Sequence, residues 1–327
     1  MNLLDLPPEI REYIYKIILD PSANHRTNKD NYTRYIYGPA LVLFRINRQI
    51  YYESRKVFRN LNVFVRIATP WPDAQKHVAM EGYVPLIAVG EKAEAFDSHS
   101  VALSIDAPNH YELDGTEEKF IILADDVGKF TRSWFYSDLS HPSLNRHLRL
   151  NLEFRDPFTP EYEEKKVPRA VQERILLPFG EVKNLNSVVV TGDPAPYPSL
   201  VKEMRAAMAV PHKSAEKCLH EATVLKDAGN KELQAGRYQK ALDLYNQAWR
   251  AMHIIINGRH RHVHGEAFFA HELHEEPFKG QHGANVRLVL RVRLVANTVL
   301  AYLKLQQYQE AIYWGMRTIS TMRGLSD

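Results

Sequence analysis

The stretch LKDAGNKELQAGRYQKALDLYNQAWRAM (225–252) decides the fold of the C-terminal part of the chain. Its small and apolar residues follow helical periodicity along one face, at Tyr238, Ala241, Leu242, Tyr245, Ala248, Trp249 and Met252. The same spacing recurs 70 residues later, at Tyr308, Ala311, Ile312, Gly315, Thr318, Ile319 and Met322. The helix before each copy also agrees, with Leu225, Ala228 and Leu233 corresponding to Val295, Thr298 and Leu303. A helix–turn–helix duplicated in sequence predicts a stack of helical repeats.

Residues 218–323 resemble tetratricopeptide repeats. The first segment, LKDAGNKELQAGRYQKALDLYNQA, has small and aromatic residues where the two helices of such a repeat pack together, at Gly229, Tyr238, Ala241, Tyr245 and Ala248. The second segment, VANTVLAYLKLQQYQEAI, departs from that pattern at Thr298 and Gly315. The resemblance implies an all-α repeat region over 213–327. Because such repeats are about 34 residues long and no middle copy is legible in 254–287, we interpret that stretch as a long insertion.

The insertion is rich in histidine, and five of the fifteen histidines fall in HRHVHGEAFFAHELHE (260–275). The segment does not contain the zinc-binding pattern HExxH, because Glu275 stands where the second histidine would be needed. His260, His262 and His264 would share one face of an extended strand, so an adventitious zinc or nickel site is the alternative. We predict no metal and no cofactor, and a loop that covers the concave face of the repeats. Its apolar anchors would be Phe268, Phe269 and Phe278.

Three polar residues of the repeat region match positions of the carboxylate clamp in chaperone-binding tetratricopeptide domains: Lys226, Asn230 and Asn297. Lys226 and Asn230 are i, i+4 neighbours on one helix face. The resemblance implies that an ammonium and amide donors converge on the C-terminal carboxylate of a chaperone peptide. The alternative is that these residues are solvated polar groups on a helix face.

The N-terminal stretch LPPEIREYIYKIIL (6–19) predicts an amphipathic helix. Its apolar face has the spacing i, i+3, i+4, i+7 and i+8, at Ile10, Tyr13, Ile14, Ile17 and Ile18. Pro7 and Pro8 suit a first helical turn, and Asp20-Pro21 ends the helix. The following ALVLFRINRQIYYESRKVFRNLNVF (40–64) predicts two short helices and then a strand near Asn62–Ile67.

Residues 3–65 resemble the divergent F-box-like domains that are abundant in filamentous fungi. The segments that carry the resemblance are LPPEIREYIYKIIL and LFRINRQIYYESRKVFRNLNVFV, although the loop between the first two helices is longer than in ordinary F-boxes. The resemblance implies docking onto a Skp-type adaptor of a cullin–RING ubiquitin ligase through a helix-in-groove contact. The residues implied in adaptor binding are Leu6, Pro7, Pro8, Ile10, Ile14 and Ile17. The alternative is that this helix packs on the strand domain behind it.

The central region, 66–198, predicts a mixed strand-and-helix domain. Four strand-like runs are SVALSIDA (100–107), KFIILA (119–124), HLRLNLEF (147–154) and NSVVVTG (186–192), and AVQERILLPFGEV (170–182) predicts a helix. The proline-rich GDPAPYP (192–198) cannot continue a central strand, so we place a boundary there. Nucleotide-binding and hydrolase motifs such as GxGxxG and GxSxG do not occur in this region.

Composition is that of an ordinary globular protein, with 45% hydrophobic and 25% charged residues and a formal net charge of +3. The single cysteine, Cys218, excludes an intrachain disulfide and suits the cytoplasm or nucleus. We therefore predict an α+β protein of three regions, 1–65, 66–198 and 213–327, that contacts neither membranes nor nucleic acid. The predicted function is non-catalytic: a substrate receptor that recruits a client protein to a ubiquitin ligase. The alternative is a tetratricopeptide scaffold or co-chaperone-like protein whose N-terminal helix is structural.

Overall fold

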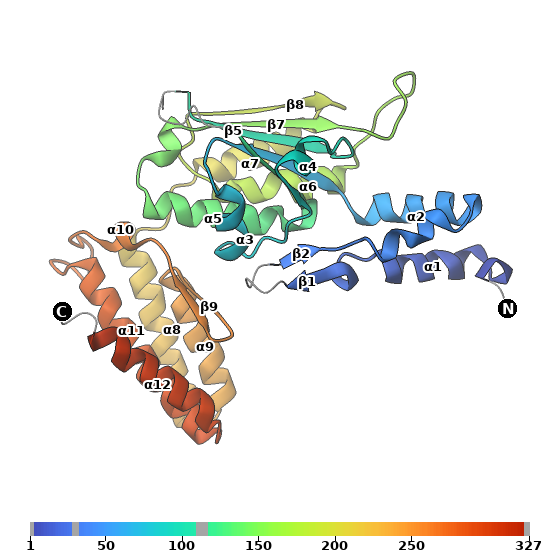
Figure 1. Cartoon of the computed structure of the whole chain (residues 1–327). Coiled ribbons are helices and arrows are strands. Elements are labelled where there is room, and N and C mark those ends of the chain that lie inside the picture. Colours follow the sequence, from blue (N-terminus) through green and yellow to red (C-terminus); the bar gives the residue numbers. More distant parts are fainter. Residues whose placement is uncertain (1–2, 28–32, 109–116, 324–327) are drawn as a thin grey trace. The chain divides into compact units, whose positions relative to one another are not determined.

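The computed structural model describes residues 3–27, 33–108 and 117–323, with side chains to residue 317 (Figure 1). The chain forms two compact units. Unit 1 comprises Met1–Phe135 and Ser143–Pro211, and unit 2 comprises Tyr136–Pro142 and His212–Asp327. Helices and one six-stranded sheet occur together, so the prediction of an α+β fold is confirmed.

The centre of unit 1 is a mixed six-stranded sheet with the strand order β4-β6-β3-β5-β7-β8. Strand β3 pairs in parallel with β5, β7 pairs in parallel with β8, and the remaining pairs are antiparallel. The four strand-like runs of the central region all form strands of this sheet. The strand bounds are β3 Phe64–Thr69, β4 Ala88–Val89, β5 Val101–Asp106, β6 Glu118–Leu123, β7 Arg149–Arg155 and β8 Ser187–Asp193.

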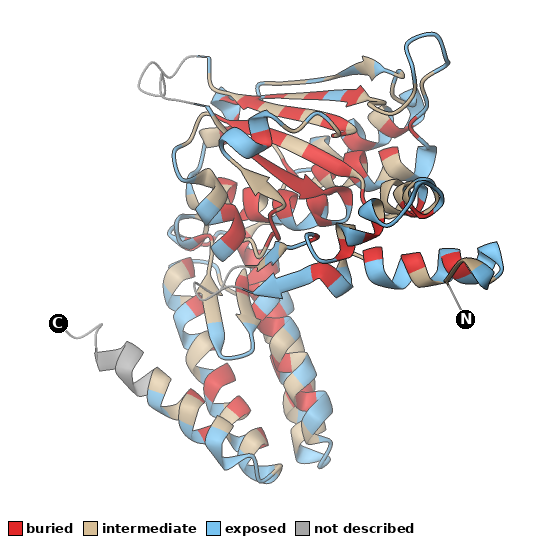
Figure 2. Ribbon diagram, turned by 45° about the vertical axis from the view of Figure 1, so that its right-hand side comes forward, coloured by how far each residue is buried: buried red, intermediate tan, exposed pale blue. Residues whose placement is uncertain are grey.

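Helices α5, α6 and α7 lie on one face of the sheet (Figure 1). Along β5 the side chains alternate between buried and half-buried, and the buried ones are Val101, Leu103 and Ile105. They join the main core of unit 1, whose residues are coloured as buried in Figure 2. The helix bounds are α3 Ala74–Met80, α4 Glu91–Glu94, α5 Val127–Ser140, α6 Arg169–Leu176 and α7 Pro198–Ala209, with a 3-10 turn at Leu177–Glu181.

The boundary that we placed at residue 198 falls on the first residue of α7. Leu200 and Met204 of this helix are fully buried in the same core as the sheet. Unit 1 therefore continues to Pro211, and the proline-rich segment connects two of its own elements.

The N-terminal part of unit 1 is a pair of helices that run in the same direction, with a small core of its own. Helix α1, Pro8–Leu19, packs against α2, Arg48–Leu61, and a 3-10 helix at Ala40–Arg45 contacts both. The Asn47 side chain caps α2 by accepting a hydrogen bond from the Ile50 N–H at 2.9 Å. Shorter elements complete this part: Leu3–Asp5 and Ser22–Asn24 as 3-10 turns, and the hairpin of β1 (His25–Thr27) and β2 (Thr33–Tyr35).

Unit 2 contains two helix–turn–helix pairs at the predicted positions. The second helix of one pair begins 70 residues after the second helix of the other. Each backbone hydrogen bond in the first turn has a counterpart in the second turn at the same offset of 70 residues. In the first pair, a Cβ on Gly229 would lie 2.4 Å from Cε1 of Tyr245, so this close helix contact requires glycine. The helices are α8 Ala215–Gln234, α9 Tyr238–Ala251, α11 Gly283–Lys304 and α12 Tyr308–Arg323. The side chains of Thr318, Ile319 and Met322 lie outside the described residues.

The insertion is not a plain loop, so the expectations of a loop and of an all-α region were wrong. It folds as a hairpin of β9 (Ile254–Asn257) and β10 (His260–Val263), followed by the one-turn helix α10 (Glu266–Phe269). The tip of the hairpin is held by α12, because Tyr313 donates a hydrogen bond to the Arg259 carbonyl at 2.7 Å. Phe269 is fully buried, whereas Phe268 and Phe278 are partly buried, in the core of unit 2.

The two repeat turns differ at one strained position. Gly236 and Gln306 occupy the same place in the two turns, and both have a positive φ, 76° and 59° respectively. A side chain with a Cβ is disfavoured in this left-handed region, whereas glycine adopts it without a clash.

Replacing Gln306 by glycine is therefore expected to raise the free energy of unfolding by about 0.5–1 kcal/mol. Gly236→Gln is the matched opposite change and should lower it by about 1 kcal/mol. Urea denaturation of the two variants and the wild type measures both effects. A destabilised Gln306→Gly variant would contradict this account of the turn.

His99 lies fully buried just before β5. Its Nδ1 is 2.9 Å from the Phe96 carbonyl, which can only accept, and its Nε2 is 2.7 Å from Nη1 of Arg155, which can only donate. These two contacts define a neutral ring protonated at Nδ1. Burial lowers the pKa of His99 to about 4, from 6.5.

This lowered pKa makes stability depend on pH. Between pH 6.5 and 4 the unfolded chain binds a proton at His99 that the folded chain does not, so stability falls as the pH falls. We expect a loss of about 2 kcal/mol from this residue between pH 7 and pH 5. Urea unfolding at both pH values should show a smaller loss for His99→Gln than for wild type. The exposed His147, changed to glutamine, is the control and should leave the slope as it is.

Candidate interaction surface on the first helix

Helix α1 turns its isoleucine face outward. The residues that it buries are Arg11, Tyr15 and Leu19, which are spaced four apart and point toward α2 and the small core. The opposite side exposes three large apolar side chains, namely Ile10 (47% exposed), Tyr13 (64%) and Ile17 (55%). Ile18, seven residues after Arg11, lies beside the buried stripe and is 36% exposed. We call Ile10, Tyr13 and Ile17 the α1 surface. These three side chains of the apolar stripe do not pack on the domain behind the helix.

An ion pair with α2 holds the helix in this orientation. Arg11 contacts the Glu53 carboxylate with two nitrogens, from Nη2 at 2.6 Å and from Nε at 2.9 Å. Nη1 of Arg11 also donates to the Leu6 carbonyl at 2.6 Å, and the Tyr15 hydroxyl donates to Glu53 at 3.0 Å. Arg11 is almost completely buried, so leaving Glu53 without this partner would cost more than an ordinary surface pair.

This geometry shifts the pKa values of Glu53 and Tyr15. The hydrogen bonds from Arg11 lower the pKa of Glu53 to about 2, from 4.5. Burial, together with the hydrogen bond to Glu53, raises the pKa of Tyr15 to about 12. At neutral pH the pair is therefore charged and the phenol is protonated, which is the state that these contacts need.

The other residues implied in adaptor binding frame the α1 surface. Pro7 and Pro8 are exposed at the start of the helix, with Pro8 as its first residue, and Leu6 and Ile14 are half-buried. Further apolar side chains are exposed on or next to the elements that pack against α1: Val42 on the 3-10 helix, Ile46 directly after it and Tyr52 on α2.

Sequence reasoning missed the ion pair that orients this helix. Arg11 was part of the predicted helix, but its burial is determined by Glu53, which is 42 residues away. The local signal that could have found it is the spacing of Arg11, Tyr15 and Leu19. These residues form a second stripe at i, i+4 and i+8 that competes with the isoleucine stripe for the interior.

The residues implied in peptide binding lie close together on α8 and α11. The Asn230 Oδ1 accepts a hydrogen bond from the Asn297 side-chain amide at 2.7 Å and another from the Tyr245 hydroxyl at 2.9 Å. Lys226 is mostly buried, and its Nζ is 2.9 Å from a carboxylate oxygen of Asp227. Their polar groups are engaged within the chain, and their role in peptide binding stays a prediction.

Two histidines of the insertion take part in ring stacking. The rings of His262 and His264 stack with centroids 6.3 Å apart, and His264 also stacks on Tyr136 at 4.3 Å. Among the described residues, no three histidine, cysteine, aspartate or glutamate side chains gather as a metal site.

The single cysteine lies near a histidine. Sγ of Cys218 is 3.8 Å from Nε2 of His253, but burial raises the pKa of this thiol to about 11. The thiolate is therefore scarce at neutral pH.

Comparisons with protein-family models, with curated proteins and with solved structures gave no match. No helix in the part of the chain that the structure describes is long and apolar enough to cross a membrane.

The Arg11–Glu53 pair predicts the behaviour of α1 in solution. Replacing Glu53 by alanine leaves a buried guanidinium without its carboxylate, so α1 should open more often. We expect the backbone amides of α1 to exchange with deuterium about tenfold faster at neutral pH. The control is Glu12→Ala, which removes the exposed ion pair with Lys16 on the same helix and should have no such effect. Equal exchange in both variants would contradict the role of the buried pair.

Proposed function

We propose that this chain is a non-catalytic protein-interaction subunit that docks through the α1 surface onto a Skp-type adaptor and recruits a client protein to a ubiquitin ligase. The observation that carries the proposal is the exposure of Ile10, Tyr13 and Ile17 on a helix that is held firmly from behind. The resemblance of residues 3–65 to F-box-like domains is the reason why we propose a Skp-type adaptor as the partner.

Apolar side chains exposed to water favour binding to a partner that covers them. Removing the three side chains of the α1 surface from water stabilises a complex by about 25 cal/mol for each Å² of apolar area that is buried. Burying the exposed part of an isoleucine or tyrosine in a well-packed groove is typical of interface hot spots. A helix that is already ordered by Arg11 and Glu53 loses little conformational entropy when it binds.

The client would be recruited elsewhere on the chain, by the rest of unit 1 or by the helical repeats of unit 2. The single cysteine is a poor candidate for a nucleophile, because burial raises its pKa to about 11 and keeps it a thiol at neutral pH. The alternative function is that of a tetratricopeptide scaffold that binds peptide C-termini through Lys226, Asn230 and Asn297. It stays a prediction, because those three residues are engaged with neighbours in the same chain.

Co-expression with a Skp-type adaptor tests the proposal. Wild type is expected to form a complex that survives size-exclusion chromatography, and the double variant Ile10→Asp/Ile17→Asp is expected to abolish it. Both side chains are about half exposed, so the double variant should still fold, which thermal unfolding monitored by circular dichroism verifies.

The control is Ile312→Asp, which changes a somewhat more exposed isoleucine (66%) on α12 of unit 2. It should leave adaptor binding unchanged. The proposal fails if wild type forms no adaptor complex, or if the double variant of α1 binds as well as the control.

A further inference from the structure

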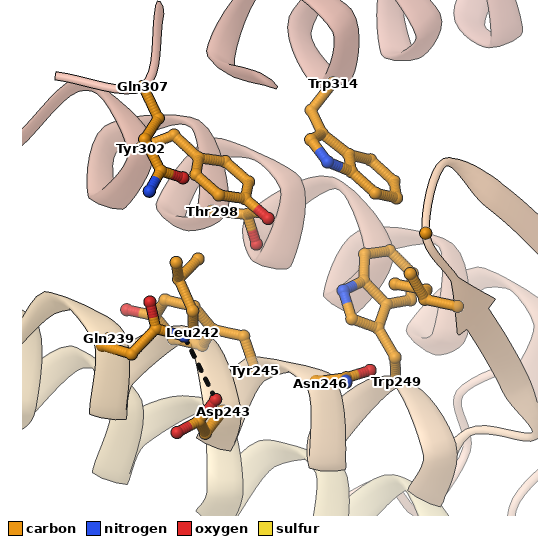
Figure 3. Close-up of a pocket in the computed structure, with 12 residues that line it drawn as sticks. Gln239, Leu242, Asp243, Tyr245, Asn246, Trp249, Thr298, Tyr302, Gln307 and Trp314 are labelled. Atoms are coloured by element: carbon orange, nitrogen blue, oxygen red, sulfur yellow. Dashed lines mark hydrogen bonds between the residues drawn. The ribbon is translucent and has the colours of Figure 1, made fainter. Parts of the chain in front are cut away.

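A cavity of about 250 Å³ lies in unit 2, between α9, the hairpin, α11 and α12 (Figure 3). Aromatic rings form much of its wall, because Trp249 of α9 and Trp314 of α12 are both buried and Tyr302 is half-buried. Ile256 of β9 closes one side. Nothing in the sequence pattern pointed to this site, since its walls come from four segments that are far apart along the chain.

Two buried oxygen atoms among the lining residues have no hydrogen-bond partner in the chain. They are Oγ1 of Thr298, a residue that is only 8% exposed, and Oδ1 of Asn246. Figure 3 shows both side chains at the cavity. Leaving a buried polar atom unpaired costs about 1–3 kcal/mol, so such atoms call for a partner. Oδ1 of Asn246 can only accept a hydrogen bond, so the partner that satisfies it carries an N–H or O–H donor, whereas the Thr298 hydroxyl can accept or donate.

Arginine side chains lie beside the cavity on the side of the hairpin, whereas Asp243 of α9, which accepts a hydrogen bond from Gln239 at 3.4 Å, is a carboxylate among the lining residues. Cζ of Arg261 lies 5.9 Å from the centroid of the Trp249 ring. Arg261 is paired across the hairpin with Ile256, so both side chains lie on the same face of the hairpin. Among the described residues, neither Arg261 nor the half-buried Arg291 of α11 makes an ion pair with a carboxylate. Burial, with the charges of Arg291 and Arg317, lowers the pKa of Arg261 to about 10, which still leaves it charged at neutral pH.

We propose that this cavity binds a small planar aromatic ring that carries an N–H or O–H donor and a negatively charged substituent. The ring would lie against the indoles of Trp249 and Trp314, its donor would reach Thr298 and Asn246, and its anionic group would be directed to Arg261.

The size of the cavity fits such a ligand. A dry engineered cavity of about 150 Å³ holds benzene, so one of this volume accommodates a bicyclic ring such as indole or purine. Stacking on aromatic side chains and a charge-assisted contact to an arginine are the interactions that commonly hold such rings in proteins. The inference is independent of adaptor docking, because it concerns unit 2 alone.

Isothermal titration of the full chain with indole-3-acetate and, separately, with adenosine monophosphate tests the proposal. Both probes combine a ring, a donor and an anionic group, and their relative affinities distinguish a carboxylate from a phosphate. At least one is expected to bind with a Kd below about 1 mM. Two matched probes each remove one feature of indole-3-acetate: naphthalene-1-acetate lacks the N–H, and indole-3-ethanol lacks the charge. If indole-3-acetate is the ligand, each should bind about five- to tenfold more weakly.

Variants then locate the binding site. Thr298→Val keeps the shape of the side chain and removes the hydroxyl, and Arg261→Gln removes the charge, so each should weaken the bound probe about five- to tenfold. Thr223→Val, which removes a hydroxyl that bonds the Leu219 carbonyl within α8, is the control and should bind as wild type does. The proposal is overturned if neither probe binds, or if Thr298→Val and Arg261→Gln both bind with wild-type affinity.

Discussion

The ion pair between Arg11 and Glu53 determines which face of α1 is buried and which face is exposed to a partner. An amphipathic helix normally buries its most apolar stripe, but α1 buries the stripe that begins with arginine. The guanidinium makes two contacts to one carboxylate and a third to a backbone carbonyl, so its desolvation is compensated by charge-assisted hydrogen bonds. Once this face is fixed, the helix geometry leaves the isoleucines on the opposite side in solvent.

Much of the fold could be predicted from the sequence because most elements are specified locally. The strands of unit 1 follow alternating or continuous apolar runs, and the four helices of unit 2 follow a repeated spacing with turns at the same offset. The role of α7 could not be predicted, since Leu200 and Met204 find their partners in a sheet that begins more than a hundred residues earlier. The hairpin was also missed, because HRHV lacks the continuous apolar run of a core strand and is stabilised by contacts with α9 and α12.

The side-chain partners at the candidate sites could not be predicted, because they depend on tertiary packing. Periodicity identified the isoleucine stripe of α1, but it could not say which of two competing stripes faces the interior. That choice depends on Glu53 of another helix. Polar positions such as Lys226 and Asn230 matched a clamp pattern in sequence, yet their side chains meet Asp227, Asn297 and Tyr245 within the chain. A sequence pattern predicts on which face of a helix a residue lies, whereas the residues that its side chain contacts depend on tertiary packing.

The two repeats of unit 2 diverge where the cavity forms. In the first pair, the ring of Tyr245 packs on Gly229, and the helices approach closely. In the second pair the large and small positions are exchanged: Val299 stands at the place of Gly229, and Gly315 at the place of Tyr245, with open space where a Cβ would be. Thr298 replaces Ala228 and brings a hydroxyl that the repeat does not need for packing. Departures from a chain's own repeat that weaken packing and add an unpaired polar atom are expected at functional sites. This is the reason to look for a ligand between α9 and α12 rather than in the histidine-rich strand beside them.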